Sequence, residues 1–156
     1  MRVSVVTVSD RASRGEYEDL SGPEIERILR ETVPGAEVER RVVPDEEEAI
    51  LGAFRASEGA DWILTTGGTG PAPRDVTPEA TRRWIDRELP GVAEALRAES
   101  YRETRNAVFS RGIAGMRGRQ YVVNFPGSVK AVRLCASVLA PLLEHGIRMA
   151  SGEGHG

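Results

Sequence analysis

The sequence predicts an α/β fold: a three-layer α-β-α single domain with a mostly parallel sheet. Apolar, β-branched runs typical of strands alternate with segments of helical periodicity along the chain, and this alternation favours parallel strands joined by helical crossovers. The 156 residues suit one domain. Internal repeats and low-complexity linkers are absent from the sequence. We therefore expect one domain over residues 1–150 and a frayed tail over residues 151–156.

The first half of the chain contains three predicted strands. Residues 2–8 form a near-continuous apolar and β-branched run, which is typical of a buried strand, and a polar loop follows over residues 9–15. A second strand is expected over residues 38–43. A third covers residues 62–66 and leads into a loop with three glycines.

Two helices are expected between these strands. The first has Pro23 at its first helical position, carries apolar residues at helical spacing and ends at Pro34-Gly35. The second opens at Asp45, where the spacing to Glu48 fits a capping box.

The second half is expected to be mainly helical around one strand. Thr77, as a capping residue before Pro78, predicts a helix that runs to about Glu88. Further elements are predicted as follows: a helix over residues 92–102, a strand over 120–124, a tight turn over 125–128, and a helical region over 129–149 that bends at Pro141. Residues 106–111 show no clear pattern of a helix or a strand.

The composition excludes several kinds of chemistry. Lys130 is the only lysine, and no Gly-Lys-Ser/Thr tripeptide exists for a Walker loop. Two histidines, His145 and His155, do not favour a Ser-His-Asp or multi-histidine zinc site, and we expect them to be structural or exposed. The single Cys135 rules out an internal disulfide framework. Catalysis would therefore use carboxylates, backbone N–H groups, hydroxyls and a hard metal ion.

Charge and hydropathy bear on partners and location. The net charge of −3 gives no general affinity for nucleic acid. Apolar runs stay shorter than the ~18–20 residues that a membrane span needs, so we expect no membrane association. The first residues lack the pattern of a signal peptide, and we expect a cytoplasmic protein.

The segment from Thr65 to Pro78 carries the strongest functional signal. Three glycines in four residues, Gly67 to Gly70, let the backbone approach a ligand and direct N–H groups at an anion. Arg74 suits phosphate and Asp75 suits a metal ion. A dinucleotide fingerprint needs a glycine at its sixth position, where this loop has Pro71 to Pro73. The pattern predicts a nucleotide or phosphate site, the alternative being an ordinary glycine-rich turn.

Two further turns follow predicted strands: Ser9-Asp10 and Asn124 to Gly127. In parallel α/β sheets, ligands bind where the carboxyl ends of the strands gather. We therefore expect these turns and the glycine-rich loop to converge on one pocket.

The sequence resembles the molybdenum cofactor biosynthesis family, and within it the molybdopterin adenylyltransferases of the MogA type. The resemblance rests on these motifs, and spans about residues 3 to 150: Val6 to Arg11, Pro44-Asp45-Glu46, Thr66 to Gly70, Arg74 to Ala80, Ser110-Arg111, and Asn124 to Ser128. It implies a fold like that of the molybdopterin-binding domains. It also implies Mg²⁺-dependent transfer of AMP from ATP to the terminal phosphate of molybdopterin, with release of pyrophosphate.

The resemblance assigns roles to residues. Asp45 and Asp75 would be the catalytic carboxylates, with Asp45 holding Mg²⁺ in part. Substrate or phosphate would contact Ser9, Asp10, Thr66, Gly67, Gly68, Thr69, Gly70, Arg74, Ser110, Asn124, Pro126, Gly127, Ser128 and Lys130. Structural alternatives stay open: Asp45 as a helix cap, Asp75 as a residue that aids a helix N-terminus, and the other side chains as turn, cap or surface groups.

The resemblance also bears on partners. It implies a homotrimer that uses molybdopterin and ATP and hands its product to a molybdate-insertion enzyme. One alternative is a non-catalytic molybdopterin-binding or carrier paralogue of the MoaB type. Another is a related enzyme that acts on a different nucleotide or pyrophosphate substrate.

Overall fold

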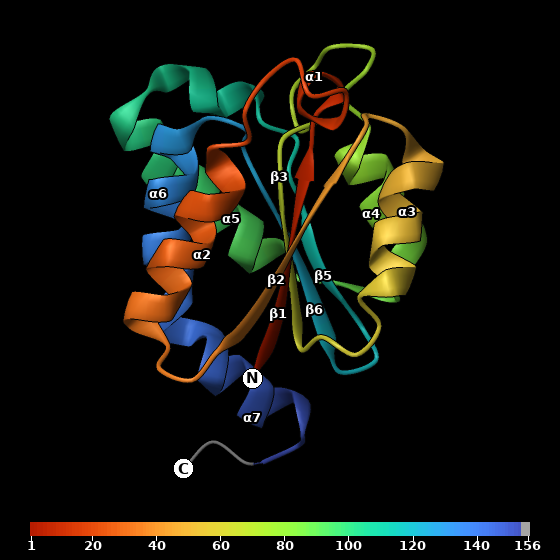
Figure 1. Cartoon of the computed structure of the whole chain (residues 1–156). Coiled ribbons are helices and arrows are strands. Elements are labelled where there is room, and N and C mark those ends of the chain that lie inside the picture. Colours follow the sequence, from red (N-terminus) through yellow and green to blue (C-terminus); the bar gives the residue numbers. More distant parts are fainter. Residues whose placement is uncertain (154–156) are drawn as a thin grey trace.

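The computed structural model describes residues 1–153 and contains one six-stranded sheet of order β2-β1-β3-β6-β5-β4 (Figure 1). Four strands are mutually parallel: β1 (Arg2–Val8), β2 (Glu37–Val43), β3 (Trp62–Thr66) and β6 (Gln120–Phe125). Two are antiparallel to their neighbours: β5 (Ala114–Arg117) and β4 (Arg87–Glu88). The prediction of a mostly parallel sheet is confirmed.

Helices cover both faces of the sheet, which makes three layers (Figure 1). One face carries α2 (Ser21–Thr32), α5 (Pro90–Glu103) and α6 (Val129–Leu139), and the other carries α3 (Glu47–Ala56) and α4 (Thr77–Trp84). The shorter elements are α1 (Asp10–Ser13), the 3₁₀ helices η1 (Arg105–Phe109) and η2 (Ala140–Leu142), and α7 (Leu143–Ala150).

Alternating side chains of β1 divide the core into two clusters. Val3 and Val5 pack with the helices of the α2 face, whereas Val6 and Val8 pack with those of the α3 face. This follows from the two-residue period of a strand. The continuous apolar run that predicted a buried strand therefore fills both cores.

The edge made by β4 and β5 was not predicted. The helix expected to reach Glu88 ends at Trp84, and Arg87–Glu88 instead pairs with Gly115 and Met116. A side chain at Gly115 would meet the Arg87 carbonyl oxygen at 2.5 Å, so the close strand approach requires glycine. In the sequence the same glycine is typical of a turn.

The predicted starts of helices in the first half of the chain were partly wrong. The predicted polar loop over residues 9–15 contains the short helix α1. Helix α2 begins at Ser21 rather than at Pro23, because the Asp19 carboxylate accepts the Gly22 N–H at 3.0 Å and caps the first turn.

Helix α2 is joined to α6 by Glu24. Its carboxylate lies 2.7 Å from Arg27 of its own helix and 2.8 Å from Arg133 of α6. Hydrogen bonds from Arg27 and then Arg133 lower the pKa of Glu24 to about 2. This carboxylate is therefore a polar link between neighbouring helices of one layer.

The C-terminal region breaks at Pro141 as predicted, with α6, η2 and α7 in succession. Helix α7 docks on β3 and β6, where the Tyr121 hydroxyl donates to the Gly146 carbonyl at 2.7 Å and the Trp62 ring stacks on Tyr121. The end of the predicted frayed tail, including His155, lies outside the described residues. Within residues 1–153, no helix is both long and apolar enough to cross a membrane.

Candidate active site

The turns after the parallel strands meet at one edge of the sheet. The Gly67 N–H donates to the Phe125 carbonyl at 3.2 Å, and the Thr66 hydroxyl donates to the Pro126 carbonyl at 2.7 Å. A side chain at Gly67 would collide with the carbonyl oxygen of Val8, the last residue of β1, directly before the third turn. The predicted convergence of the three turns is confirmed.

The glycine-rich loop contains consecutive backbone N–H groups that lack a protein acceptor within residues 1–153. Gly67 and Gly68 adopt φ angles of 94° and 68°, a region that favours glycine. The Thr77 hydroxyl donates to the Gly67 carbonyl at 2.9 Å, and the Thr77 N–H donates to the Gly68 carbonyl at 3.1 Å. Within residues 1–153, the N–H groups of Gly68, Thr69 and Gly70 donate to no protein acceptor. Such groups suit a bound anion.

Thr77 therefore does not act as the predicted cap. It is the first residue of α4, and its hydroxyl donates back to the loop instead of accepting from the helix. The physical reason is that the loop carbonyl of Gly67 offers an acceptor at the same place. Thr77 thus fastens the glycine loop to α4.

Asp10 and Asp45 hold each other by a reciprocal pair of hydrogen bonds. The Asp10 N–H donates to the Asp45 carboxylate at 2.8 Å, and the Asp45 N–H donates to the Asp10 carboxylate at 3.0 Å. The predicted capping box at Asp45 is wrong, because the Asp45 carboxylate is engaged by Asp10 and α3 begins after Glu46. This pair joins the turns after β1 and β2.

Arg74 completes this cluster from the glycine-loop side. Its guanidinium donates to both carboxylate oxygens of Asp10, at 2.8 and 3.0 Å. Asp75 folds back on the same segment, where its carboxylate accepts the Ala72 N–H at 3.0 Å. A side chain at Gly70 would come within 2.8 Å of that carboxylate, so Gly70 and Asp75 close the loop against each other.

The two central carboxyls have opposite electrostatic settings. Burial raises the pKa of Asp45, and the charges of Asp10 and Asp75 add to this, while the hydrogen bond from the Asp10 backbone opposes it. The hydrogen bonds from Arg74 lower the pKa of Asp10, helped by the Asp45 backbone N–H. Of the two, Asp45 is therefore the carboxyl whose charged form the protein favours less, and a cation beside it would favour that form.

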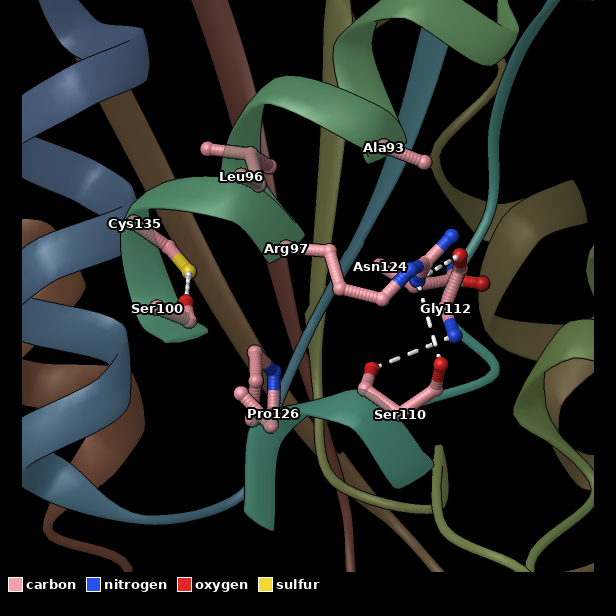
Figure 2. Close-up of a pocket in the computed structure, with 10 residues that line it drawn as sticks. Ala93, Leu96, Arg97, Ser100, Ser110, Gly112, Asn124, Pro126 and Cys135 are labelled. Carbon is pink, nitrogen blue, oxygen red and sulfur yellow. Dashed lines mark hydrogen bonds between the residues drawn. The ribbon is translucent and has the colours of Figure 1, made fainter. Parts of the chain in front are cut away.

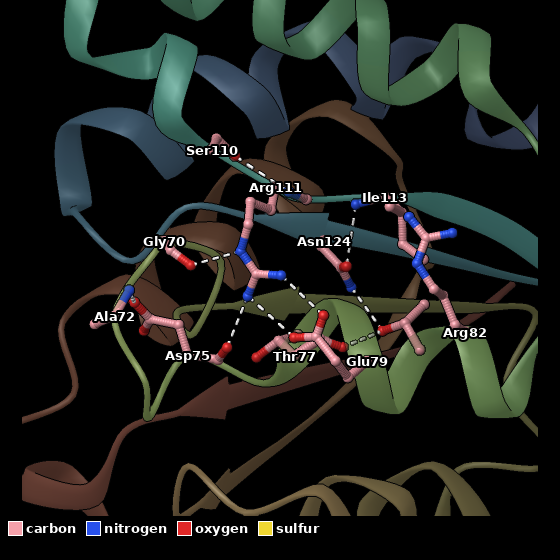
Figure 3. Close-up of polar contacts among 12 residues, drawn as sticks. Gly70, Ala72, Asp75, Thr77, Glu79, Arg82, Ser110, Arg111, Ile113 and Asn124 are labelled. Carbon is pink, nitrogen blue, oxygen red and sulfur yellow. Dashed lines mark hydrogen bonds and ion pairs between the residues drawn. The ribbon is translucent and has the colours of Figure 1, made fainter.

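Arg111 contacts the loop from its other side (Figure 3). Its N–H donates to the Thr69 carbonyl and its guanidinium donates to the carbonyls of Gly70 and Asp75, all at 2.7–2.8 Å. The same guanidinium forms an ion pair with Glu79 at 2.8 Å. Arg111 belongs to the quoted Ser110-Arg111 motif, but sequence reasoning assigned it no role; its adjacency to Ser110 was the available signal.

Asn124 was predicted to contact substrate, but its side chain is buried and bonded within the protein, with its polar contacts drawn in Figure 3. The amide accepts from the Ile113 N–H at 3.2 Å and donates to the hydroxyls of Thr65 and Thr81 at 3.0 Å each. All of these partners are in the protein interior. These bonds hold β6, β3 and α4 in register, and a role toward substrate stays a prediction.

A small cavity lies beside Asn124 (Figure 2). Ser110, Pro126 and Cys135 are among its lining residues, and its volume is about 20 Å³. That is room for about one water molecule, so it does not admit a nucleotide. The Ser110 hydroxyl accepts the Gly112 N–H at 3.3 Å.

Two larger pockets are lined by other predicted binding residues. One, of about 130 Å³, is lined in part by Ser9, Thr66, Gly67 and Gly127. The other, of about 400 Å³, lies between the end of α5 and the start of α6 and includes Ser128 and Lys130. The predicted binding residues therefore border both pockets.

Three further predicted binding side chains also have partners within the protein. The Ser9 hydroxyl accepts the Ala12 N–H and caps α1, and the Ser128 hydroxyl accepts the Ala131 N–H and caps α6. Lys130 lies 3.8 Å from Glu103 of α5, and no contact joins it to the Asp10–Asp45–Arg74 cluster within residues 1–153. Ligand contacts by these three residues stay predictions.

The donor set fits Mg²⁺ better than zinc. Within the described part of the chain, no group of three His, Cys, Asp or Glu side chains could hold a metal ion. Asp45 and the adjacent Asp10 offer hard oxygen atoms, and Mg²⁺ is commonly held by one or two carboxylates together with substrate phosphates. Burial and the charges of Asp10 and Asp75 disfavour the charged form of Asp45, and a bound cation would offset this.

Fold and site together define an α/β protein in which three turns converge at the carboxyl edge of a mostly parallel sheet. The comparisons with known proteins agree. The sequence model of the family described as "Probable molybdopterin binding domain" matches residues 4–145, so the chain belongs to this family.

Individual relatives match this chain over most of their own length or over a part of it. A molybdopterin adenylyltransferase of Helicobacter pylori (strain J99) is 37% identical over 97% of this chain and 89% of its own length. The molybdenum cofactor synthesis protein cinnamon of Drosophila melanogaster is 40% identical over 93% of this chain, which spans only 25% of that protein. The structure of the molybdopterin biosynthesis enzyme MoaB from Thermus thermophilus is 44% identical, with a TM-score of 0.84 over 97% of this chain and 96% of that one.

Proposed function

We propose that this protein is a molybdopterin adenylyltransferase in molybdenum cofactor biosynthesis. It transfers AMP from ATP to the terminal phosphate of molybdopterin and releases pyrophosphate. The observation that carries the proposal is the row of unengaged N–H groups at Gly68 to Gly70, within residues 1–153, next to the poorly compensated carboxylate of Asp45. A polyphosphate with its counter-cation satisfies both at once.

The chain's own residues would bind and orient the two substrates. The N–H groups of the glycine loop would receive phosphate oxygens, and Arg74 would exchange its ion pair with Asp10 for one with phosphate. Asp75, at the end of the same loop, would help to position the reacting groups. Most of the rate enhancement would come from positioning and charge neutralisation.

Mg²⁺, held by Asp45 with Asp10 adjacent, would neutralise charge on the ATP phosphates. The nucleophile is a phosphate that is already largely ionised near neutral pH, so the reaction needs no histidine base. This agrees with a converging set of turns built from carboxylates, arginine and backbone N–H groups.

A second candidate is a molybdopterin-binding paralogue without catalysis. It is favoured by the N–H groups of Gly68 to Gly70, which have no protein acceptor within residues 1–153 and could bind a ligand phosphate without any reaction. Asp45 and Asp75 argue against it, because a carrier needs no pair of acidic groups that repel its anionic ligand. We further propose that the protein works as a homotrimer in the cytoplasm and delivers its product to a molybdate-insertion enzyme.

The test is an assay of pyrophosphate release with purified protein, molybdopterin, ATP and Mg²⁺. The proposal expects release that depends on all three additions. Calorimetric binding of molybdopterin without any such release would favour the carrier instead.

A further inference from the structure

Arg111 occupies the concave side of the segment from Thr69 to Asp75 (Figure 3). One residue supplies donors to three carbonyls of that segment: its N–H to Thr69 at 2.8 Å, its Nε to Gly70 at 2.8 Å and its Nη2 to Asp75 at 2.7 Å. The two ends of the segment are thus fixed to one residue.

Glu79 holds this guanidinium in place. Its carboxylate accepts from Nη1 at 2.8 Å and from Nη2 at 3.0 Å, from the first turns of α4. The hydrogen bonds with Arg111 lower the pKa of Glu79, so its carboxylate is ionised at neutral pH. The pair is a fork-to-fork contact, which fixes orientation as well as distance.

Peptide geometry gives these contacts a consequence for the ligand side. In a trans peptide the carbonyl and the following N–H point in opposite directions. Because Thr69 and Asp75 direct their carbonyls at Arg111, the N–H groups of Gly70 and Val76 point away from it. Within residues 1–153, neither N–H has a protein acceptor.

We propose that Arg111 is a positioning residue that sets the direction of two N–H donors for polyphosphate: its backbone N–H sets that of Gly70, and its guanidinium, oriented by Glu79, sets that of Val76. This rests on the proposed function. Arg111 itself does not touch substrate; it fixes which way the loop peptides face. Loss of Arg111 should weaken ATP binding and change the rate of AMP transfer much less. The reason is that the N–H groups would contact phosphate both before and during the reaction.

The decisive variant is Arg111→Lys. A lysine keeps a positive charge for Glu79 and the backbone N–H that donates to Thr69, but it has no planar fork with which to reach both Gly70 and Asp75. We expect KM for ATP to rise about tenfold while kcat stays within about threefold. Glu79→Gln, which leaves the loop bonds in place but loosens the arginine, should raise KM for ATP by a smaller factor.

The matched control is Arg82→Gln. Arg82 lies on the same helix and forms an ion pair at 2.9 Å with Glu88, with no contact to the loop within residues 1–153. We expect it to leave KM, kcat and the melting temperature unchanged. The comparison separates loss of one surface arginine from loss of the loop support.

Hydrogen–deuterium exchange of the ligand-free protein is a second readout. In Arg111→Lys, faster exchange should be confined to the amides that are bonded at this loop, those of Ala72, Asp75 and residue 111. Exchange that rises equally across the sheet, with KM for ATP unchanged, would mean that Arg111 only stabilises the fold and would overturn the proposal. Because this readout needs no substrate, it still decides the role of Arg111 if wild-type protein releases no pyrophosphate.

Discussion

Replacing Asp45 by Asn should raise stability while it removes activity. The asparagine keeps an oxygen for the Asp10 N–H, so the reciprocal pair between the two turns can persist. What disappears is a charge that burial and the neighbouring charges of Asp10 and Asp75 disfavour. If the Asp45 carboxylate instead stabilised the fold, the asparagine variant would be less stable than wild type.

The sign of the stability effect follows from the pKa. Since the pKa of Asp45 is raised in the folded state, its ionisation costs stability at neutral pH, and this cost vanishes below the ordinary value of ~4. Discounted for the solvent that reaches this half-buried group, the gain in Asp45→Asn is up to about 1 kcal/mol at pH 7. For a chain of this size that is up to about 2–4 °C in melting temperature.

The activity should fall by about 2–3 kcal/mol of transition-state stabilisation, which is about 30- to 150-fold. Thermal unfolding at pH 7 and below pH 4, together with pyrophosphate release, measures both effects. The control is Asp61→Asn at the opposite end of the sheet, where the carboxylate also accepts a backbone N–H, that of Arg2, at 2.8 Å. Asp45→Asn that unfolds more than about 1 kcal/mol more easily, or turns over like wild type, would refute the reasoning.

Other parts of the structure carry three more predictions. Asp75→Asn should keep the melting temperature and lose about 2–3 kcal/mol of transition-state stabilisation in the pyrophosphate assay; wild-type turnover would contradict this role. Glu24→Gln should lose about 1–2 kcal/mol at pH 7, because its lowered pKa stabilises the fold above ~4.3, and the difference from wild type should shrink toward pH 2 in denaturant titrations. Gly67→Ala should destabilise more than Gly35→Ala, since both have positive φ but only Gly67 would meet backbone, the Val8 carbonyl; equal losses of melting temperature would show that the turns can separate.

The parallel part of the fold was predictable because each strand carries its own signal. The strand at residues 2–8 and that at residues 62–66 are apolar runs buried on both faces, and local periodicity identifies them. Strand β4 has two residues, and β5 contains Gly115, whose place is set by backbone contact with a distant strand. A pattern within a short stretch of sequence cannot predict a contact with a strand that is far away in the chain.

The candidate site, like the fold, has parts that the sequence predicted and parts that it did not. The three turns could be placed because each follows a strong strand, but the partners of their side chains could not. Asp45 and Thr77 both have the residue types of helix caps, yet their oxygens bond to Asp10, 35 positions away, and to Gly67, 10 positions away. A cap motif states which bonds a side chain can make, and the tertiary fold decides which one it makes.

The contact between Gly127 and Gly67 gives the site two parts of different stiffness. A side chain at Gly127 would come within 3.3 Å of the Gly67 Cα atom, so two main chains lie directly against each other there. At this contact there is no side chain whose rotation could separate the two main chains. The rim from Gly70 to Asp75, in contrast, is held by groups that water reaches on one side. Any adjustment to a bound ligand would therefore fall on the segment from Gly70 to Asp75 and its ties to Arg111, while the contact between the two glycines stays fixed.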